Sequence, residues 1–211
     1  MPTLNEYFDQ ILLINLDHRP DKLGESLIEC AKHGIAVRRI AGVWLGPGWG
    51  NDGCTQAHAK ALETIVANGW QRTLILEDDF VCRFDDMQER FSRDIVWVLY
   101  SEAKDWEMLY LGGHYAEKPQ ARINSRVIRT GHMFTTSSYA VTLELAKEVA
   151  PVLRASTMTA IDNMYAPYNV RGRCYCLQPR LMMQRMSFSD IQQRVCNNGP
   201  CMEDPNHENM V

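Results

Sequence analysis

The sequence predicts an α/β fold in which a mixed, mostly parallel central sheet is flanked by helices. Two short apolar runs, at 11–14 and 73–76, are each about as long as a buried strand, and a third strand-like segment lies between them at 35–40. The segments between them carry apolar residues at helical spacing. An alternation of strand, helix, strand, helix and strand is typical of doubly wound sheets, which bind ligands at the carboxyl ends of their strands.

The first strand and the first helix follow from an apolar run, a proline and a glycine. Residues 11–14 predict a strand that is buried on both faces and that ends before Pro20, because proline cannot pair in a central strand. Apolar residues at helical spacing then predict a helix over 21–33. We expect Asp21 to be its N-cap and Gly34 to end it.

The next two strands enclose a glycine-rich loop and a second helix. Residues 35–40 are predicted to form a strand, and the glycines of 42–50 predict a long loop of the kind that often covers a binding site. A helix is expected over 54–68, ending at Gly69, and it leads into a buried strand at 73–76.

The second half of the chain is less regular. The polar tail 197–211 is expected to be loosely attached, and it leaves open that the chain is one module of a longer polypeptide. The elements predicted in this half are a helix over 84–100, strands at 106–111, 125–129 and 133–141, and a helix over 142–153.

Length and composition favour a single domain. With 211 residues, of which 45% are apolar and 23% charged, the chain suits one hydrophobic core of ordinary size, so we predict one domain over 1–211. A formal net charge of −4 argues against a nucleic-acid partner, since phosphate binding needs an excess of Lys and Arg. No apolar stretch approaches the roughly 18 to 20 residues of a membrane span.

The seven cysteines favour a reducing compartment. They are odd in number and scattered through predicted core segments, and the N-terminus has no basic region followed by an apolar one, so we expect a cytoplasmic protein. Cys174, Cys176, Cys196 and Cys201 lack the spacing of paired zinc ligands. We therefore interpret the first two as half-buried thiols on a strand.

Three adjacent carboxylates, Glu77, Asp78 and Asp79, follow the strand predicted at 73–76. Like charges this close repel one another, and the sequence suggests a divalent cation as the group that relieves the repulsion. Oxygen ligands favour Mg²⁺ or Mn²⁺, which keep positions open for substrate phosphates. The alternative is that Asp78 or Asp79 merely caps the helix predicted to start near residue 84.

Several short motifs occur in an order and spacing that, taken together, resemble the glycosyltransferase 25 family. This family includes lipopolysaccharide and procollagen galactosyltransferases and has the GT-A fold, and the resemblance spans nearly the whole chain. Departures are a shortened loop region after Gly42 and Gln56 where relatives often carry Ser. The segments that carry the resemblance are Ile14 to Asp17 with Arg19, Asp21 and Lys22; Gly53 and Cys54 with His58; Ile75 to Asp79; Thr135 and Thr136 with Tyr139; Ile161 and Asp162; and Ser187 to Ile191.

The resemblance implies roles for the acids. Glu77, Asp78 and Asp79 correspond to the DXD-type motif of GT-A enzymes. Asp79 is the main candidate for a direct Mn²⁺ ligand, and Asp78 or Glu77 would contact the metal or the ribose. The ion would bridge the donor diphosphate and offset the charge that grows on the leaving nucleoside diphosphate. A further metal ligand often comes from the C-terminal segment, where His207 is the candidate; a loosely attached tail is the alternative.

The donor nucleotide is expected at the end of the first strand. There the resemblance assigns Asn15, Leu16, Asp17 and Arg19 to the nucleobase, ribose and phosphate, with the Arg19 guanidinium offering either a charge or a stacking plane. For Arg19 the alternative is a surface position. His58 would orient a donor group or else pack within a helix interface.

Asp162 is the candidate catalytic base. The resemblance implies inversion at the anomeric carbon, in which a carboxylate takes the proton of the acceptor hydroxyl during a direct displacement. The alternative is that Asp162 is the N-cap of a short helix.

Aromatic and basic residues suggest two further surfaces. Sugars pack on aromatic rings, so Trp44, Trp49 and Tyr115 are expected to be exposed and to shape an acceptor pocket. The other surface is a sparse basic cluster that either holds a diphosphate or an acidic glycan, or is simply solvated. Its members are Arg171, Arg173, Arg180 and Arg185.

Together these inferences predict a metal-dependent, inverting glycosyltransferase. It would use Mn²⁺ or Mg²⁺ to transfer a hexose or deoxyhexose from a UDP-sugar to a hydroxyl of a glycan or glycoprotein. We expect 1–100 to bind the nucleotide sugar and 101–211 the acceptor, in a monomer or within a longer multidomain chain. The alternatives are a degenerate member of the fold that serves as a binding or scaffold module, and a metal-dependent nucleotidyltransferase.

Overall fold

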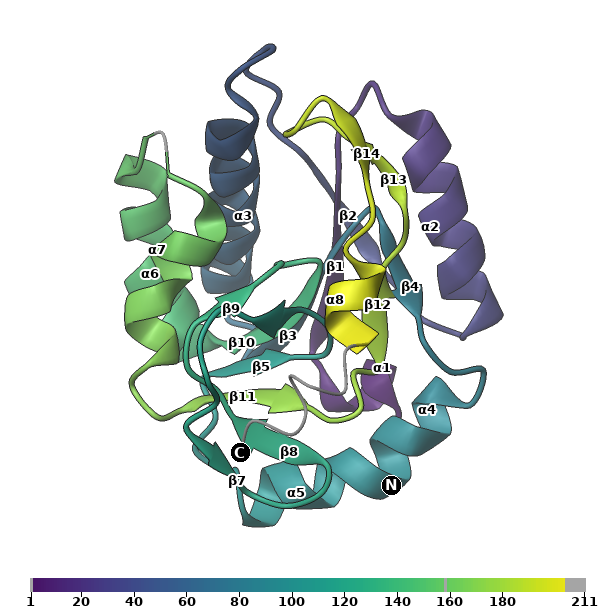
Figure 1. The fold of residues 1–211 in the computed structure, drawn as a ribbon, viewed down its shortest axis with the longest axis vertical. Helices are drawn as coiled ribbons and strands as arrows, with labels where there is room; N and C mark the ends of the chain where they lie inside the picture. The colour runs from purple at the N-terminus through teal and green to yellow at the C-terminus, as the bar shows by residue number, and fades with distance from the viewer. Residues whose placement is uncertain (1, 158, 204–211) are drawn as a thin grey trace.

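The computed structural model of the protein describes residues 2–157 and 159–203. It contains a large central sheet with helices on both sides, which confirms the predicted α/β class (Figure 1). The strands of this sheet are β1 (Gln10–Asn15), β2 (Arg38–Ala41), β3 (Arg72–Glu77), β5 (Met108–Tyr110), β7 (Ala121–Arg122), β8 (Val127–Arg129), β10 (Ser138–Thr142) and β11 (Cys174–Leu177).

The sheet is mixed and mostly parallel, as predicted. Across the sheet the strand order is β2-β1-β3-β10-β5-β11-β8-β7. β1 is parallel to both β2 and β3, and β5 is parallel to β11. Within this sheet β10 and β8 run against the direction of the other strands. The carboxyl ends of β1 and β3 therefore meet at one edge of the sheet.

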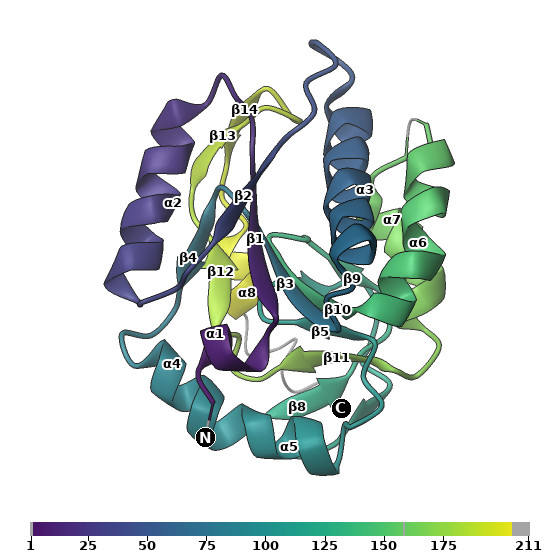
Figure 2. The same cartoon turned by 180° about the vertical axis from the view of Figure 1, so that it is seen from behind.

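Helices cover the two faces of the sheet. Figures 1 and 2 show α2 on one side, whereas α3, α6 and α7 pack together on the other. None of the helices within 2–157 and 159–203 is long and apolar enough to cross a membrane. The helices are α1 (Leu4–Tyr7), α2 (Pro20–Lys32), α3 (Gly50–Asn68), α4 (Met87–Arg90), the π-helix η1 (Phe91–Ile95), α5 (Val96–Ser101), α6 (Leu143–Ala155), α7 (Ile161–Asn169) and α8 (Gly199–Glu203).

Side chains of the central strands alternate between two hydrophobic cores. Ile11 and Leu13 of β1 lie in the core shared with α1, η1 and α5, whereas Leu12 and Ile14 lie in the core shared with α3 and α6. All four side chains are buried. This double burial explains why β1 is a continuous apolar run in the sequence rather than an alternating one.

Small antiparallel pairs lie beside the main sheet. The pair of β4 (Phe80–Cys82) with β12 (Met182–Gln184) matters most for the site, because β4 follows directly after Asp79 and its pairing brings the C-terminal part of the chain to the acids. Within the described ranges these pairs are β4 (Phe80–Cys82) with β12 (Met182–Gln184), β6 (His114–Tyr115) with β9 (Met133–Phe134), and β13 (Ser187–Ser189) with β14 (Arg194–Cys196).

The strand predicted at 133–141 is in fact two strands in different sheets. Thr135 has a φ of 72°, in the left-handed region that interrupts a strand. The chain therefore turns after β9, and only β10 enters the main sheet, between β3 and β5.

Two helix starts also differ from expectation. Arg19, not Asp21, is the N-cap of α2, because Pro20 occupies the first helical position, where its fixed φ and missing N–H are tolerated. α3 begins at Gly50, four residues before the predicted start at 54. A Cβ atom on Gly50 would lie 2.5 Å from the Cα of Ile191, so glycine permits the close approach of α3 to the turn between β13 and β14.

Candidate active site

The acids after β3 lie beside the end of β1, as the parallel pairing requires. Asn15, the last residue of β1, donates a hydrogen bond from Nδ2 to Asp78 Oδ2 at 2.8 Å. Asp78 and Asp79 occupy the turn between β3 and β4, and the N-cap of α4 is Asp86. The alternative that Asp78 or Asp79 caps this helix is therefore wrong.

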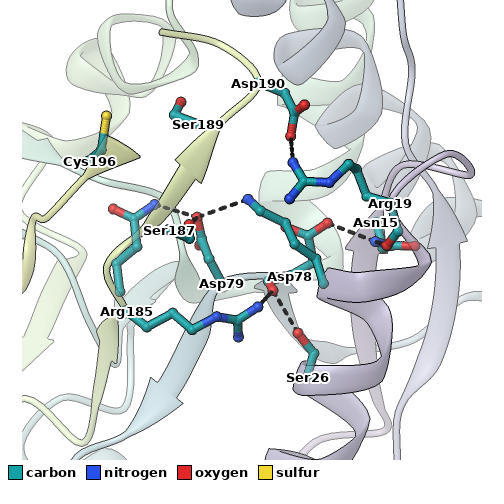
Figure 3. A network of polar contacts seen from close by, with 12 residues as sticks. Asn15, Arg19, Ser26, Asp78, Asp79, Arg185, Ser187, Ser189, Asp190 and Cys196 are labelled. Carbon is teal, nitrogen blue, oxygen red and sulfur yellow. Dashed lines mark hydrogen bonds and ion pairs between the residues drawn. The ribbon is translucent and has the colours of Figure 1, made fainter. Parts of the chain in front are cut away.

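α2 places a buried lysine against the acids. Lys22 is 5% exposed, and its Nζ lies 3.4 Å from Asp78 Oδ1 and 3.7 Å from Asp79 Oδ2. The Asp78 carbonyl also accepts hydrogen bonds from Ser26 Oγ and Arg185 Nη2, each at 2.7 Å (Figure 3). The Lys22 ammonium group thus partly offsets the repulsion among the carboxylates. The sequence suggested a divalent cation for this role, and the structure shows that Lys22 shares it.

Glu77 is held by a chain of buried hydrogen bonds. Its Oε1 accepts from Thr136 Oγ1 at 2.8 Å and lies 3.2 Å from His58 Nε2. His58 Nδ1 in turn lies 2.7 Å from the Tyr139 hydroxyl, which is 2.9 Å from the Tyr165 hydroxyl. Burial alone would raise the pKa of Glu77, but the hydrogen bond and charge of His58 and the Thr136 hydroxyl outweigh it and lower the pKa. Glu77 is therefore ionised in the folded protein.

Asp79 has an oxygen atom left over for a ligand. Its Oδ2 accepts from Gln184 Nε2 at 2.9 Å, whereas its Oδ1 is buried without a hydrogen-bond partner. Burial, followed by the negative charges of Glu77 and Asp78, raises the pKa of Asp79 to about 7. A buried, unpaired carboxylate oxygen beside other carboxylates is the donor set that a hard divalent cation requires, so these residues fit Mn²⁺ or Mg²⁺.

Two cavities meet at Glu77. The larger has a volume of about 420 Å³, and Asp79 and Asp162 both line it. The smaller, of about 90 Å³, is lined by the strand end at Asn15 and Leu16 and by Trp44. Residues that line both cavities are Cys54, Glu77 and Ile191.

Asp162 lies in the first turn of α7, on the wall of the larger cavity. Ala160 is the N-cap of this helix, so the alternative that Asp162 caps it is wrong. Its Oδ1 is buried without a hydrogen-bond partner. Burial, with the charge of Glu77, raises the pKa of Asp162 to about 6, although the Thr135 backbone and His58 act in the opposite direction.

The two remaining donor-side candidates, Asp17 and Arg19, are engaged in ion pairs. Asp17 is exposed and pairs with Arg39. Arg19 is half-buried rather than on the surface, and its guanidinium contacts both Asp21 and Asp190. Through Asp190 it ties the start of α2 to the turn between β13 and β14, which borders the smaller cavity (Figure 3). His207 lies outside the described residues.

The aromatic residues do not share one pocket. Trp44 and Trp49 are 42% and 50% exposed, as expected, but they line the smaller cavity beside Leu16. Tyr115 is buried, with its hydroxyl 3.0 Å from Cys176 Sγ and the guanidinium of Arg180 over its ring. The prediction that Tyr115 is exposed and shapes an acceptor pocket is therefore wrong.

The predicted basic cluster does not form. Arg180 is buried and donates to the carbonyls of Gly113 and Leu177. Each of the other three arginines forms an ion pair with an acidic residue. The pairs are Arg171 with Glu148, Arg173 with Glu107, and Arg185 with Glu25.

The cysteines on β11 are more deeply buried than predicted. None of the cysteines in the described part of the chain is in a disulfide. Cys174 and Cys176 are almost fully buried, because both side chains point from the same face of the sheet into one hydrophobic core.

Sequence reasoning missed the roles of Lys22, Thr136 and Gln184. Lys22 and Thr136 belong to segments that carry the family resemblance, but nothing in their spacing says that they contact acids more than fifty residues away. Gln184 reaches Asp79 only because β12 pairs with β4. No local signal in the sequence identifies such a partner.

Replacing Asp162 with asparagine is expected to stabilise the protein at neutral pH. A carboxyl group whose pKa is raised by folding binds its proton more tightly in the folded state, so its stabilising effect is present below about pH 4 and is lost as the pH rises through about 6. Asp162→Asn removes the ionisable group, so the variant does not lose this stability as the pH rises. Above pH 7 the gain should be on the order of 2 kcal/mol, or about 4 to 8 °C in melting temperature.

Thermal melts in EDTA between pH 4 and pH 8 would measure this effect. Asp86→Asn is the matched control, because the hydrogen bond from Arg90 lowers the pKa of Asp86 and the sign of its effect is reversed. A melting difference between Asp162→Asn and wild type that does not grow with pH would contradict the assignment of a buried, destabilising carboxylate at Asp162.

Comparison with known proteins relates this chain to one family. No protein-family model matches the sequence. The chain is 24% identical over 186 residues to procollagen galactosyltransferase 1 of Danio rerio, which covers 74% of this chain and 30% of that protein. It is 27% identical over 186 residues to the inactive glycosyltransferase 25 family member 3 of Homo sapiens, covering 74% and 31%. It is 25% identical over 174 residues to a glycosyltransferase 25 family member of Anopheles gambiae, covering 77% and 28%.

The chain spans about 30% of the length of the curated relatives it matches. Among solved structures, a glycosyltransferase involved in the glycosylation of the major capsid of PBCV-1 superposes with a TM-score of 0.53 at 12% identity, covering 87% of this chain and 95% of that one. This likeness confirms the fold that the resemblance implied. The chain therefore has the GT-A fold and is similar in sequence to members of the glycosyltransferase 25 family.

Proposed function

We propose that this domain is a metal-dependent, inverting glycosyltransferase that transfers a hexose or deoxyhexose from a UDP-sugar to a hydroxyl of a glycan or glycoprotein. One observation carries the proposal. Asp79 and Asp162, on segments far apart in the chain, both present buried oxygen atoms without hydrogen-bond partners, and both line one cavity of about 420 Å³. A cavity of this size accommodates a sugar and part of an acceptor.

Asp79, assisted by Asp78, would hold Mn²⁺ or Mg²⁺. Their oxygen atoms suit either ion, and Lys22 and Gln184 contact Asp79 at Oδ2, which leaves Oδ1 for the ion. When bound, the ion supplies Lewis-acid stabilisation of the negative charge on the departing diphosphate. Lys22 adds a fixed positive charge beside the same carboxylates, which orients them before any substrate arrives.

The smaller cavity is the proposed site for the nucleobase and ribose. Asn15 and Leu16 at the end of β1 line it together with Trp44 and Trp49, whose rings offer stacking surfaces. We accordingly place these two tryptophans on the donor side rather than in the acceptor pocket. Glu77 lies between the two cavities, where a ribose hydroxyl would pass, and His58 holds it in place.

Asp162 is the proposed base for the acceptor hydroxyl. Its pKa of about 6 lies near neutral pH, so the group is ionised there yet basic enough to accept a proton as the oxygen atom attacks. Its position across the larger cavity from the β12–β13 segment leaves room for an acceptor between them. The proton would move from the acceptor oxygen to Asp162 as the bond to the anomeric carbon forms and the bond to the diphosphate breaks.

A non-catalytic binding module is the second candidate. The human relative that is 27% identical is described as inactive, so catalysis is not a property of every similar protein. A binding module would need the cavities but not the free oxygen atoms of both Asp79 and Asp162.

A donor screen separates these two candidates. The purified protein would be incubated with UDP-galactose, UDP-glucose and related donors, with Mn²⁺, Mg²⁺ or EDTA, and UDP release would be measured. We expect release with at least one donor and its loss in EDTA. Binding of UDP with no release from any donor, with or without a glycan acceptor, would favour the binding module over the transferase.

A further inference from the structure

A second cluster of potential metal ligands lies away from the acids, between α2 and β4. Within residues 2–157 and 159–203, two groups of side chains place His, Cys and carboxylate donor atoms within 4.8 Å of one another. One is Cys54, His58 and Glu77, in the site described above. The other is Glu29, His33 and Cys82, which we call the α2–β4 cluster.

The two groups differ in whether their donor atoms are already satisfied. In the first, both ring nitrogens of His58 have partners, Tyr139 on one side and Glu77 on the other. In the α2–β4 cluster, the side chain of His33 is 2% exposed and its Nε2 has no hydrogen-bond partner. That nitrogen lies 3.3 Å from Glu29 Oε1, without the alignment of a hydrogen bond. An unpaired buried nitrogen that faces a carboxylate and a thiol indicates a missing ligand.

We propose that Glu29, His33 and Cys82 bind a zinc ion. Imidazole, thiolate and carboxylate are the ligands that zinc takes in proteins, and three of them with a water molecule complete a tetrahedron. Ligand atoms about 2.0 to 2.3 Å from a tetrahedral ion lie roughly 3.3 to 3.7 Å from one another. The separation of 3.3 Å between His33 Nε2 and Glu29 Oε1 falls in this range. The donor atoms of all three residues already lie within 4.8 Å of one another, so small side-chain rotations would bring the remaining pairs to tetrahedral spacing.

Charge and surroundings support this assignment. A Zn²⁺ ion with one carboxylate and one thiolate forms a neutral unit, which suits a half-buried position; the Cys82 thiol would release its proton to solvent. Hydrogen bonds also hold this part of the chain together. The Cys82 backbone N–H donates to Glu29 Oε1 at 2.8 Å, and Gln88 Nε2 donates to the His33 carbonyl at 3.1 Å. These bonds fix the Glu29 carboxylate against β4 and the backbone at His33.

The zinc site would brace the elements that position the acids. α2 carries Lys22 and Ser26, which contact Asp78 and Asp79, and β4 begins directly after Asp79. Joining α2 to β4 through an ion would fix the distance between these two segments. The donor set also separates this site from the one at Asp79, because nitrogen and sulfur ligands select zinc whereas oxygen ligands select Mn²⁺ or Mg²⁺.

Cobalt substitution tests the proposal. The metal-free protein would be titrated with Co²⁺ in excess Mg²⁺, which occupies oxygen-only sites. We expect one equivalent to bind with the visible bands of tetrahedral cobalt and a near-ultraviolet sulfur-to-cobalt charge-transfer band, all abolished by Zn²⁺. Cys82→Ser should lose the charge-transfer band, and His33→Gln should weaken binding roughly tenfold or more.

Cys54→Ser is the matched control, since it removes the thiol of the other cluster and should keep the band. Asp79→Asn should keep it too, so failure of the transferase proposal would not affect this result. The zinc proposal is overturned if wild type shows no charge-transfer band, or if the band is lost in Cys54→Ser and kept in Cys82→Ser. Should Cys82→Ser not fold, unchanged affinity in His33→Gln would overturn it equally.

Discussion

Asp79→Asn is expected to reduce metal-dependent UDP release by about 10³-fold. The free Oδ1 of Asp79 is the proposed metal contact, and an amide at this position has one oxygen fewer and no negative charge. Shape is preserved, so the loss would come from metal binding rather than from packing. Turnover of the best donor at saturating Mn²⁺ measures the loss of UDP release, and calorimetric titration with Mn²⁺ measures the loss of metal binding.

Asp85→Asn is the matched control for this experiment. Asp85 is an acid on the same segment, after β4, but its side chain is 90% exposed and pairs with Lys32 at the surface. Its replacement should leave both turnover and Mn²⁺ affinity unchanged. If Asp79→Asn retains wild-type turnover while binding Mn²⁺ normally, the ion is held elsewhere and the role assigned to Asp79 is wrong.

Asp162→Asn is expected to lower kcat for transfer by roughly 10² to 10⁴-fold while leaving donor affinity close to wild type. The carboxylate is proposed to take a proton from the acceptor and to make no contact with the nucleotide, so its loss affects the chemical step. Initial rates with varied donor and acceptor concentrations separate kcat from KM. The same variant should melt at a higher temperature, so unfolding would not account for its loss of activity.

The pH profile gives a second measure of the same role. A base must be ionised to act, and the pKa of Asp162 is about 6, so the wild-type rate should fall as the pH is lowered through that value. Asn163→Ala, at the next and exposed position of α7, should keep both the rate and the profile. Transfer by Asp162→Asn at the wild-type rate would exclude Asp162 as the base.

Much of the first half of the chain could be predicted because its signals are local. The run Ile11 to Ile14 is apolar at every position, which only a strand buried on both faces requires, and Thr73 to Leu76 is similar. Parallel neighbours end at the same edge of a sheet, so the parallel pairing of these two strands places Asn15 beside Glu77. Their adjacency follows from chain direction alone.

The second half was predicted less well because its elements are short and paired across the chain. The strand expected over 133–141 is divided at Thr135, which has a positive φ. The conformational propensity of threonine does not indicate such a backbone turn. Tyr115, expected at the surface, is buried under Arg180 because β6 and β9 form a separate pair. Burial of this kind is decided by neighbours that lie far away in the sequence.

The sequence by itself determined the order of the elements, the edge of the sheet that carries the acids and the family that they resemble, because apolar periodicity and adjacent polar residues are properties of neighbouring positions. Only the tertiary structure decided that Lys22 lies between Asp78 and Asp79, that Gln184 reaches Asp79, and that Asp162 faces the same cavity. Those contacts join residues many positions apart, and packing of α2, β12 and α7 around the sheet is what brings them within a few ångströms.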